Sequence, residues 1–342
     1  MEKCLGNGNN SIQQEEVERI IDAHAAPGCS IAIASPTETL SFSVGHYDGA
    51  DGPEVSPRTV YDVASVSKLF TTALALRLHE KGTLSINDRC ADYLENFQQS
   101  DITLVDLLTH KVDFNVMLSK YRGMYTDGVG LRNALMGIQP PSHSSKGVFY
   151  GNLEFIYLGK IIEDVTQRDL QSNMRALFRD LGLSKTYTGP DITRLDIKTP
   201  PTEVIDGMAV QGVTHDETAR TLGGLAGNAG IFTTAEDLVK FGTAWLDGKI
   251  VHTEELRHAT FRDYDQSGTR PQAIGWWMRY PAPGGERATP GIFSHTGYTG
   301  SMLLINPDNG KAGAMTCNRT YYGRDNANQR QIWEQLVNWA QA

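Results

Sequence analysis

The sequence has no excess of basic residues, no long hydrophobic run and few cysteines. Its 342 residues include 31 lysines and arginines against 40 aspartates and glutamates, which gives a net charge of −9 without a basic cluster. Proteins that bind nucleic acid carry a basic patch, so we expect no nucleic-acid partner. No stretch of about 18 apolar residues occurs, so the sequence predicts no membrane-spanning helix.

The cysteines and histidines of the sequence also lack the spacing that is typical of metal ligands. Free cysteine is often buried as a small hydrophobic residue, so we expect most of the cysteines to lie unpaired in or near the core. His252 and His258 flank two glutamates without His-Glu-x-x-His spacing, so we expect neither a metal nor a cofactor. Residues 1–10 lack the apolar core of a secretory signal, which favours a cytoplasmic location unless a leader has been removed. The cysteines are widely spaced: Cys4, Cys29, Cys90 and Cys317.

The two ends of the chain carry the clearest strand patterns. Apolar stripes predict helices at residues 11–24, which Ser11 would cap, and at residues 326–340. A Pro-Asp-Asn-Gly turn separates the last two strand patterns, which favours a hairpin. Four segments predict two strand pairs: 29–35 with 39–44, and 301–306 with 312–318.

The middle of the chain is mostly short helical patterns joined by loops that contain glycine and proline. The clearest helices are predicted at residues 154–167 and 170–181. At roughly 150 residues per domain, the length suggests two domains. We therefore expect a mixed α/β (α+β) fold, in which a central antiparallel sheet built from both chain ends is flanked by helices. The expected domains are a sheet domain of residues 1–80 and 227–342 and a mostly helical insertion of residues 81–226, with the active site at their interface.

Ser65 and Lys68 form the first candidate for chemistry. The nearly all-apolar residues 69–78 that follow predict a buried helix. Three residues are close to one helical turn, so Lys68 should lie beside Ser65. Its amine could accept or relay the hydroxyl proton, and the helix N-terminus favours developing negative charge. About one such spacing is expected by chance in a chain of this length, so a helix cap beside a lysine is the alternative.

Two further motifs could serve the same chemistry. Tyr150 and Asn152 precede a predicted helix; a tyrosine near a lysine can act as a general base and then as an acid, and the asparagine could orient the lysine. His295 to Tyr298 (His-Thr-Gly-Tyr) stands directly before a predicted strand, where glycine lets a ligand or another backbone approach. The alternatives are a turn with a buried tyrosine and a glycine-rich strand entry with a hydrogen-bonded histidine.

Together, and in this order, the three motifs resemble those of the serine β-lactamase and penicillin-binding-protein superfamily. The Tyr-x-Asn motif is most similar to the branch of class C β-lactamases, DD-carboxypeptidases and esterases. The resemblance covers about residues 15–340. Three supporting segments also match in order: 60–65, 106–110 and 223–234.

The resemblance implies that Ser65 is the acylated nucleophile and that Lys68 and Tyr150 share the proton transfer. It further implies an oxyanion hole formed by the backbone amides of Ser65 and Tyr298. A histidine stands at position 295, where many relatives have lysine. The resemblance implies that five residues bind the substrate: Asn152, His295, Thr296, Gly297 and Tyr298.

The expected function is a serine hydrolase that acts through an acyl-enzyme on amides or esters. A D-alanyl-D-alanine carboxypeptidase or D-peptidase and an esterase are equally compatible with the motifs. The alternatives are a β-lactamase, an acyltransferase and a penicillin-binding sensor that deacylates slowly. Residues 111–114 (Lys-Val-Asp-Phe) depart from the Thr-Ser-Gly-Leu of many relatives, which leaves the substrate open. The partner should be a small molecule or peptide, and the sequence does not indicate an oligomeric state.

Overall fold

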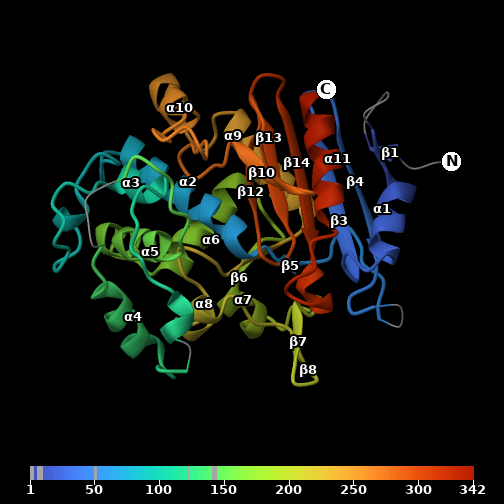
Figure 1. The fold of residues 1–342 in the computed structure, drawn as a ribbon, viewed down its shortest axis with the longest axis horizontal. Coiled ribbons are helices and arrows are strands. Elements are labelled where there is room, and N and C mark those ends of the chain that lie inside the picture. The colour runs from blue at the N-terminus through green and yellow to red at the C-terminus, as the bar shows by residue number, and fades with distance from the viewer. Residues whose placement is uncertain (1–3, 6–10, 50–51, 122, 141–144) are drawn as a thin grey trace.

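A five-stranded antiparallel sheet forms the centre of one half of the molecule (Figure 1). The computed structural model describes residues 4–5, 11–49, 52–121, 123–140 and 145–342. Both chain ends supply the sheet, as the sequence predicted, because the C-terminal β14 pairs directly with the N-terminal β3. The strand order is β12 (Phe293–Thr296), β13 (Met302–Asn306), β14 (Lys311–Cys317), β3 (Gly28–Ala34) and β4 (Thr39–Gly45).

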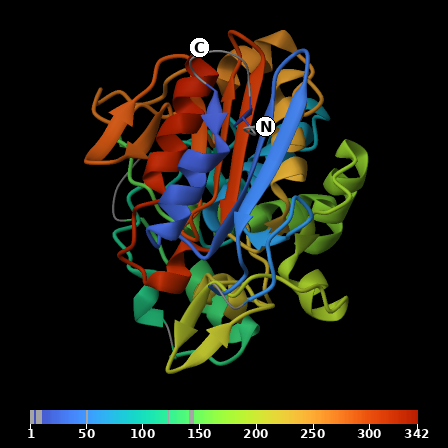
Figure 2. The ribbon, with the colours of Figure 1, turned by 90° about the vertical axis from the view of Figure 1, so that its right-hand side faces the viewer.

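Helices cover both faces of this sheet, and the residues of β3 show why. Its larger side chains, such as Ile31 and Ile33, face a core shared with α1 (Gln14–Asp22) and α11 (Arg330–Gln341). These two helices lie side by side on that face (Figure 2). The smaller Ala32 and Ala34 face the second core, where α9 (Ala235–Leu246) packs closely against β3 and β14.

Two helix starts differ from the sequence prediction. The first helix begins at Gln14, and the hydroxyl of Ser11 accepts a bond from the Gln13 side chain instead of capping it. Residues 12–13 form β2 (Ile12–Gln13), which pairs with β1 (Cys4–Leu5). The last helix begins at Arg330, four residues after the predicted start at residue 326. The Asn326 side chain donates to the carbonyls of residues 24 and 25, and residues 328–329 form a turn before the helix.

The helix that follows Ser65, α2 (Ser67–Glu80), lies in the core that joins the sheet to the helical part of the chain. Phe70 stacks on Phe241 of α9 with ring centroids 3.9 Å apart and meets Phe178 edge-on at 5.7 Å. The first ten residues of α2 are all buried, in agreement with the predicted buried helix. The remaining helices are α3 (Leu104–Leu108), α4 (Gly128–Met136), α5 (Leu153–Thr166), α6 (Leu170–Leu181), α7 (Gly189–Arg194), α8 (Glu217–Thr221) and α10 (Glu254–Thr260).

Short strands outside the central sheet were not predicted. A three-stranded sheet lies beside the start of α2, and its order is β5 (Tyr61–Asp62), β9 (Ile231–Thr233) and β6 (Tyr187–Thr188). Strands of two to four residues are too short to show alternation in sequence. Two hairpins complete the fold: β7 (Glu203–Ile205) with β8 (Met208–Val210), and β10 (Arg279–Ala282) with β11 (Gly285–Ala288).

Two expectations about composition can be compared with the described residues. Cys29, Cys90 and Cys317 are buried and unpaired, as expected. Within the same residues, no helix is both long and apolar enough to cross a membrane.

Candidate active site

Ser65 lies in a 3₁₀ turn, Ala64–Val66, that joins β5 to α2. The carboxylate of Asp62 fixes this turn by accepting the backbone N–H of Ala64 at 2.8 Å and that of His215 at 2.7 Å. Gly297 packs so closely beneath the turn that a Cβ there would lie 2.3 Å from the carbonyl oxygen of Val63. A glycine at position 297 therefore lets the end of β12 approach the serine.

Lys68 is fully buried and joins three of the predicted site residues. Its ammonium donates to Ser65 Oγ at 3.0 Å, to Tyr150 Oη at 2.9 Å and to Asn152 Oδ1 at 2.8 Å. An ammonium group has three donors, and all three are used here. The contact predicted from the Ser-x-x-Lys spacing is therefore present, and a proton can pass between the serine and tyrosine oxygens through a single nitrogen.

His295 lies on β12 and is fully buried behind aromatic rings. Its Nδ1 lies 3.0 Å from the carbonyl oxygen of Thr296, so Nδ1 carries the proton and Nε2 is an acceptor. Burial, and then the charge of Lys68, lower the pKa of His295 well below its ordinary value, which keeps the ring neutral. The ring of Trp277 lies 4.8 Å from His295 and meets Tyr150 edge-on at 5.2 Å. This histidine thus packs beside the Tyr150 ring, whereas its contact with substrate stays a prediction.

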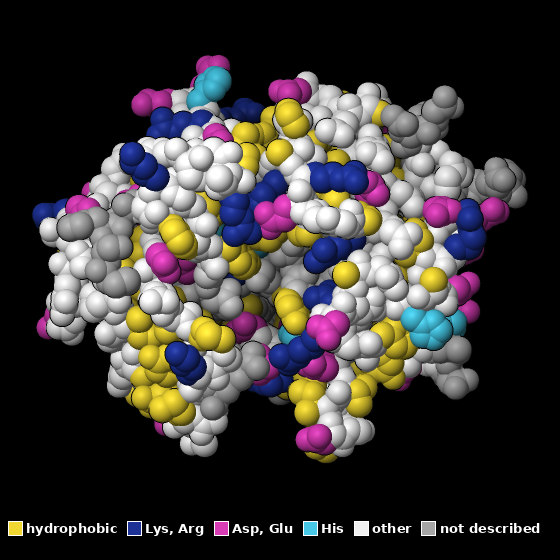
Figure 3. All heavy atoms as spheres, in the orientation of Figure 1, with side chains coloured by type: hydrophobic (Ala, Val, Ile, Leu, Met, Phe, Trp, Pro, Cys, Tyr) yellow, Lys and Arg dark blue, Asp and Glu magenta, His cyan; other side chains and the backbone are white. Residues whose placement is uncertain are grey.

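A cavity of about 420 Å³ opens beside the serine. Figure 3 shows lysine and arginine side chains gathered around the hollow in this face. The C-terminal segment lines the cavity with three arginines and one aspartate, which are Arg319, Arg324, Arg330 and Asp325. Of these, Arg330 lies at the start of α11, and its Nε is buried with no hydrogen-bond partner among the described residues. No sequence motif indicated this cationic wall, because the arginines have no shared spacing with the catalytic residues. The predicted site residues that line the cavity are Ser65, Tyr150, Thr296, Gly297 and Tyr298.

A second cavity, of about 380 Å³, lies on the other side of Tyr150. It is lined by residues 112–118, the segment that contains most of the departure from the family pattern, and by Phe149, Asn152 and Arg270. Phe149 is 41% exposed and Met117 is 64% exposed, so apolar surface faces this space. The site therefore has two neighbouring cavities, one lined by arginines and one of mixed lining that exposes apolar side chains.

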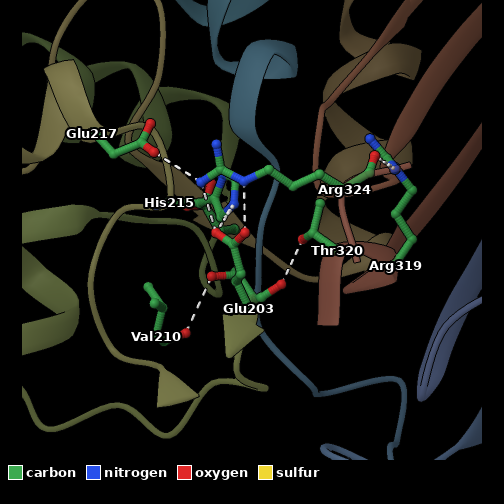
Figure 4. Close-up of polar contacts among 9 residues, drawn as sticks. Glu203, Val210, His215, Glu217, Arg319, Thr320 and Arg324 are labelled. Atoms are coloured by element: carbon green, nitrogen blue, oxygen red, sulfur yellow. Dashed lines mark hydrogen bonds and ion pairs between the residues drawn. The ribbon is translucent and has the colours of Figure 1, made fainter. Parts of the chain in front are cut away.

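Tyr298 is held between His215 and a cation. Its ring stacks on His215 at 5.8 Å, and the guanidinium of Arg319 lies 4.8 Å from the ring centre. Behind it, Glu203 accepts two bonds from Arg324, at 2.6 and 2.9 Å, and its carboxylate lies 3.1 Å from His215 Nε2 (Figure 4). We call His215 and Glu203 the outer pair.

The guanidinium of Arg324 also donates to Glu217 at 2.8 Å, so it joins the β7 hairpin to α8 (Figure 4). The bonds from Arg324 hold the pKa of Glu203 below its usual value, with the nearby His215 adding to the effect. The outer pair is thus an ionised carboxylate with a direct cationic partner.

A second histidine and glutamate lie behind Tyr150, and we call His110 and Glu154 the inner pair. Both side chains are buried, with His110 Nδ1 3.3 Å from Glu154 Oε1. Burial raises the pKa of Glu154 to about 8, an effect that the charge of Lys68 only partly offsets. Burial likewise lowers the pKa of His110 well below its ordinary value. Although residue 110 stands in a matching sequence segment, no sequence signal linked it to residue 154.

The fold and the serine–lysine–tyrosine arrangement together define a serine hydrolase. The profile of the Beta-lactamase family matches residues 14–337, and the chain belongs to this family. Among its relatives, a putative D-alanyl-D-alanine carboxypeptidase of Escherichia coli K12 is 25% identical over 77% of this chain and 70% of the relative. A protein of the same description from Salmonella typhi is 25% identical over 80% and 74%.

Solved structures show the same fold. A β-lactamase/D-alanine carboxypeptidase from Pseudomonas syringae superimposes with a TM-score of 0.73 at 20% identity, over 96% of this chain and 97% of that chain. A class C β-lactamase from Rhodobacter sphaeroides gives a TM-score of 0.68 at 21% identity, over 94% and 97%. The predicted family and fold class are confirmed.

Proposed function

We propose that the protein is a carboxypeptidase-type serine hydrolase, which removes a C-terminal residue bearing a free carboxylate from an acyl-D-alanyl-D-alanine or similar D-peptide. The observation that carries this choice is the cationic wall of the cavity beside Ser65, with the unpartnered Nε of Arg330. A buried donor without a partner costs free energy, and a carboxylate is the group that a guanidinium binds best. The names of the relatives support the same substrate class.

In the proposed mechanism, Ser65 Oγ attacks the carbonyl carbon of the scissile amide. Tyr150 reacts as the phenolate: the Lys68 ammonium gives one proton to the Tyr150 oxygen and takes the proton of Ser65 Oγ in its place, since Lys68 contacts both oxygens. The carbonyl oxygen becomes an oxyanion, which the backbone N–H groups of Ser65 and Tyr298 stabilise. As the C–N bond breaks, Tyr150 returns the proton to the departing amine.

Hydrolysis of the acyl-enzyme reverses the same proton path. A water molecule gives a proton to Tyr150 and attacks the ester carbon, and the second tetrahedral intermediate collapses with the proton returning to Ser65 Oγ. Asn152 holds Lys68 through its side-chain oxygen during both steps. We further propose that the site lies between a sheet domain, which supplies Ser65, and the helical insertion of residues 81–226, which supplies Tyr150 and Asn152.

The two cavities suggest how a peptide would lie. The leaving residue, with its carboxylate, would occupy the cationic cavity next to Thr296 and Arg330, and the acyl part would extend past Tyr150 toward residues 112–118. An esterase is the second candidate, because the exposed apolar side chains of Phe149 and Met117 in the second cavity would equally accept the acyl chain of an ester. Only a free carboxylate on the leaving group makes use of the cationic wall, which favours the peptidase.

The test compares an acyl-D-alanyl-D-alanine peptide with the same peptide amidated at its C-terminus. We expect hydrolysis of the free acid, a much lower kcat/KM for the amide, and no hydrolysis by Ser65→Ala. Arg330→Gln should lower kcat/KM for the acid by about tenfold, the size expected for one charge-assisted hydrogen bond. Arg287→Gln is the matched control, because Arg287 pairs with Glu334 of α11 outside the cavity.

Equal rates on the acid and the amide would contradict the proposed carboxylate recognition. Hydrolysis of simple esters without hydrolysis of either peptide would replace the peptidase with the esterase. An Arg330→Gln variant that matches Arg287→Gln on the free acid would remove Arg330 from the binding site.

A further inference from the structure

The inner pair touches the segment that carries two of the proposed site residues. The backbone N–H of Gly151 donates to His110 Nδ1 at 3.4 Å, and the imidazole ring lies 4.7 Å from the Tyr150 ring. The Glu154 carboxyl group packs against the same glycine, where a Cβ would lie 2.6 Å from one of its oxygens. The inner pair therefore supports residues 150–152 from behind.

The two contacts of His110 Nδ1 favour one arrangement of the protons. The N–H of Gly151 points to Nδ1 of His110 at 3.4 Å, which favours Nδ1 as the unprotonated acceptor of a neutral ring. The proton of that ring is then on Nε2, a buried atom with no hydrogen-bond partner among the described residues. Glu154 Oε1 approaches the same nitrogen at 3.3 Å, and an ionised carboxylate there would face a lone pair. The contact is favourable when the carboxyl group is protonated and donates its O–H to Nδ1.

The surroundings agree with a neutral carboxyl group. Glu154 is 2% exposed, and no arginine or lysine bonds to it among the described residues. Burial raises its pKa to about 8, whereas an exposed glutamate is ionised at neutral pH. The charged and titratable groups around the pair are Lys68 from α2, Asp113 from the loop after α3, Tyr150, Arg270, Arg279 from β10 and His295 from β12.

We propose that Glu154 is a positioning residue whose neutral carboxyl group donates to His110 and thereby holds residues 150–152 in their active arrangement. The inference rests on the proposed function, because it needs Tyr150 and Asn152 to act in catalysis. When Glu154 ionises, it can only accept, so the proton of His110 must move to Nδ1. The N–H of Gly151 then loses its acceptor, and a negative charge appears close to Lys68.

The kinetic test measures kcat and KM against pH for wild type, Glu154→Gln and Glu154→Leu. Glutamine keeps an N–H donor but cannot ionise, whereas leucine keeps the volume without a donor. We expect wild-type kcat to fall as the pH rises through about 8. Glu154→Gln should keep most of the neutral-pH activity and lose this alkaline fall, and Glu154→Leu should lose about tenfold or more in kcat with a smaller change in KM.

The matched control is Glu163→Gln on the same helix, where Glu163 pairs with the partly exposed Arg132. Its pH profile should follow that of wild type. An unchanged alkaline fall in Glu154→Gln, together with full activity in Glu154→Leu, would overturn the proposal.

An infrared measurement separates this inference from the proposed function and does not depend on the leucine variant folding. Difference spectra of the inactive Ser65→Ala protein should contain a protonated carboxylic acid band at pH 7 that disappears as the pH rises through about 8. The band should be missing from the double variant with Glu154→Gln. No acid band at pH 7 would overturn the inference even if hydrolysis by the wild type is confirmed.

Discussion

Two histidine–glutamate pairs lie against two tyrosines of the site, and they have opposite electrostatics. The inner pair, His110 and Glu154, is buried without a directly bonded cation among the described residues, and the pKa of Glu154 is raised to about 8. In the outer pair, His215 and Glu203, Arg324 bonds both carboxylate oxygens and holds the pKa of Glu203 below its usual value. Histidine and glutamate thus form a neutral pair beside Tyr150 and an ionic pair beside Tyr298.

The contrast shows that the charge of such a pair depends both on how deeply the carboxyl group is buried and on whether a guanidinium bonds to it. A carboxylate loses hydration when it is buried, and only a close cation or several donors can offset that loss. Glu203 has a bidentate guanidinium, whereas the carboxyl group of Glu154 meets one imidazole nitrogen and its own backbone N–H. The following changes test this difference.

The largest expected effect is the loss of activity when Tyr150, which packs against His110 of the inner pair, is replaced. Tyr150→Phe removes the oxygen that accepts a bond from Lys68 and that we propose transfers the proton, so kcat should fall by about 10²–10⁴-fold. Steady-state kinetics on the preferred peptide measure the loss, and circular dichroism checks the fold. A rate within threefold of wild type would give the whole proton transfer to Lys68.

The next effect concerns stability against pH. The folded-state pKa of Glu154 is raised, so its neutral form stabilises the fold fully below the unfolded pKa, and this stabilisation is lost as the pH rises toward about 8. Relative to wild type, Glu154→Gln should therefore gain on the order of a few kcal/mol in free energy of unfolding as the pH rises from about 4.5 to about 8. Urea unfolding at several pH values measures this gain.

Glu203→Gln should show the opposite dependence. Its folded-state pKa is lowered, so the ionised group stabilises the fold above the unfolded pKa, and the advantage of wild type over Glu203→Gln should shrink as the pH falls through that lowered pKa. The same trend in both variants would remove the contrast between the pairs.

A smaller effect should follow from breaking the outer pair's cationic contact. Arg324→Met leaves two carboxylates, those of Glu203 and Glu217, without their shared partner, and should lower the free energy of unfolding at pH 7 by about 1–3 kcal/mol. Arg287→Met is the control, because its exposed pair with Glu334 should contribute about 0–1 kcal/mol. Equal losses in the two variants would show that the outer pair contributes no more than a surface ion pair.

The smallest effect on activity is expected when Tyr298, which stacks on His215 of the outer pair, is replaced. Tyr298→Phe keeps the ring between His215 and Arg319 and keeps the backbone N–H proposed for the oxyanion hole. Since the side chain is 47% exposed, kcat/KM should change by no more than about twofold. A loss as large as that of Tyr150→Phe would mean that the phenol itself takes part in the reaction.

The parts of the fold that could be predicted depend on local pattern. Alternating apolar residues identified the strands at both chain ends, and the one-turn spacing placed Lys68 beside Ser65. The cap proposed for Ser11 was wrong, because residues 12–13, which directly precede the helix, pair with the short strand of residues 4–5. Local sequence rules cannot predict such a contact between separate segments.

The electrostatics of the site could not be predicted, because they depend on residues far apart in the chain. His110 meets Glu154 and Arg324 meets Glu203 only after folding, and the raised pKa of Glu154 comes from burial that its own segment does not determine. The cationic wall is likewise assembled by the turns before α11, which place Arg330 beside the cavity.

Formation of an acyl-enzyme on Ser65 can be measured by rapid-quench mass spectrometry of the intact protein with the best hydrolysed substrate and with benzylpenicillin. We expect one added acyl group on the wild type, located by digestion to the peptide that contains Ser65, and none on Ser65→Ala. An equal adduct on Ser65→Ala, or hydrolysis that persists in that variant, would contradict this expectation.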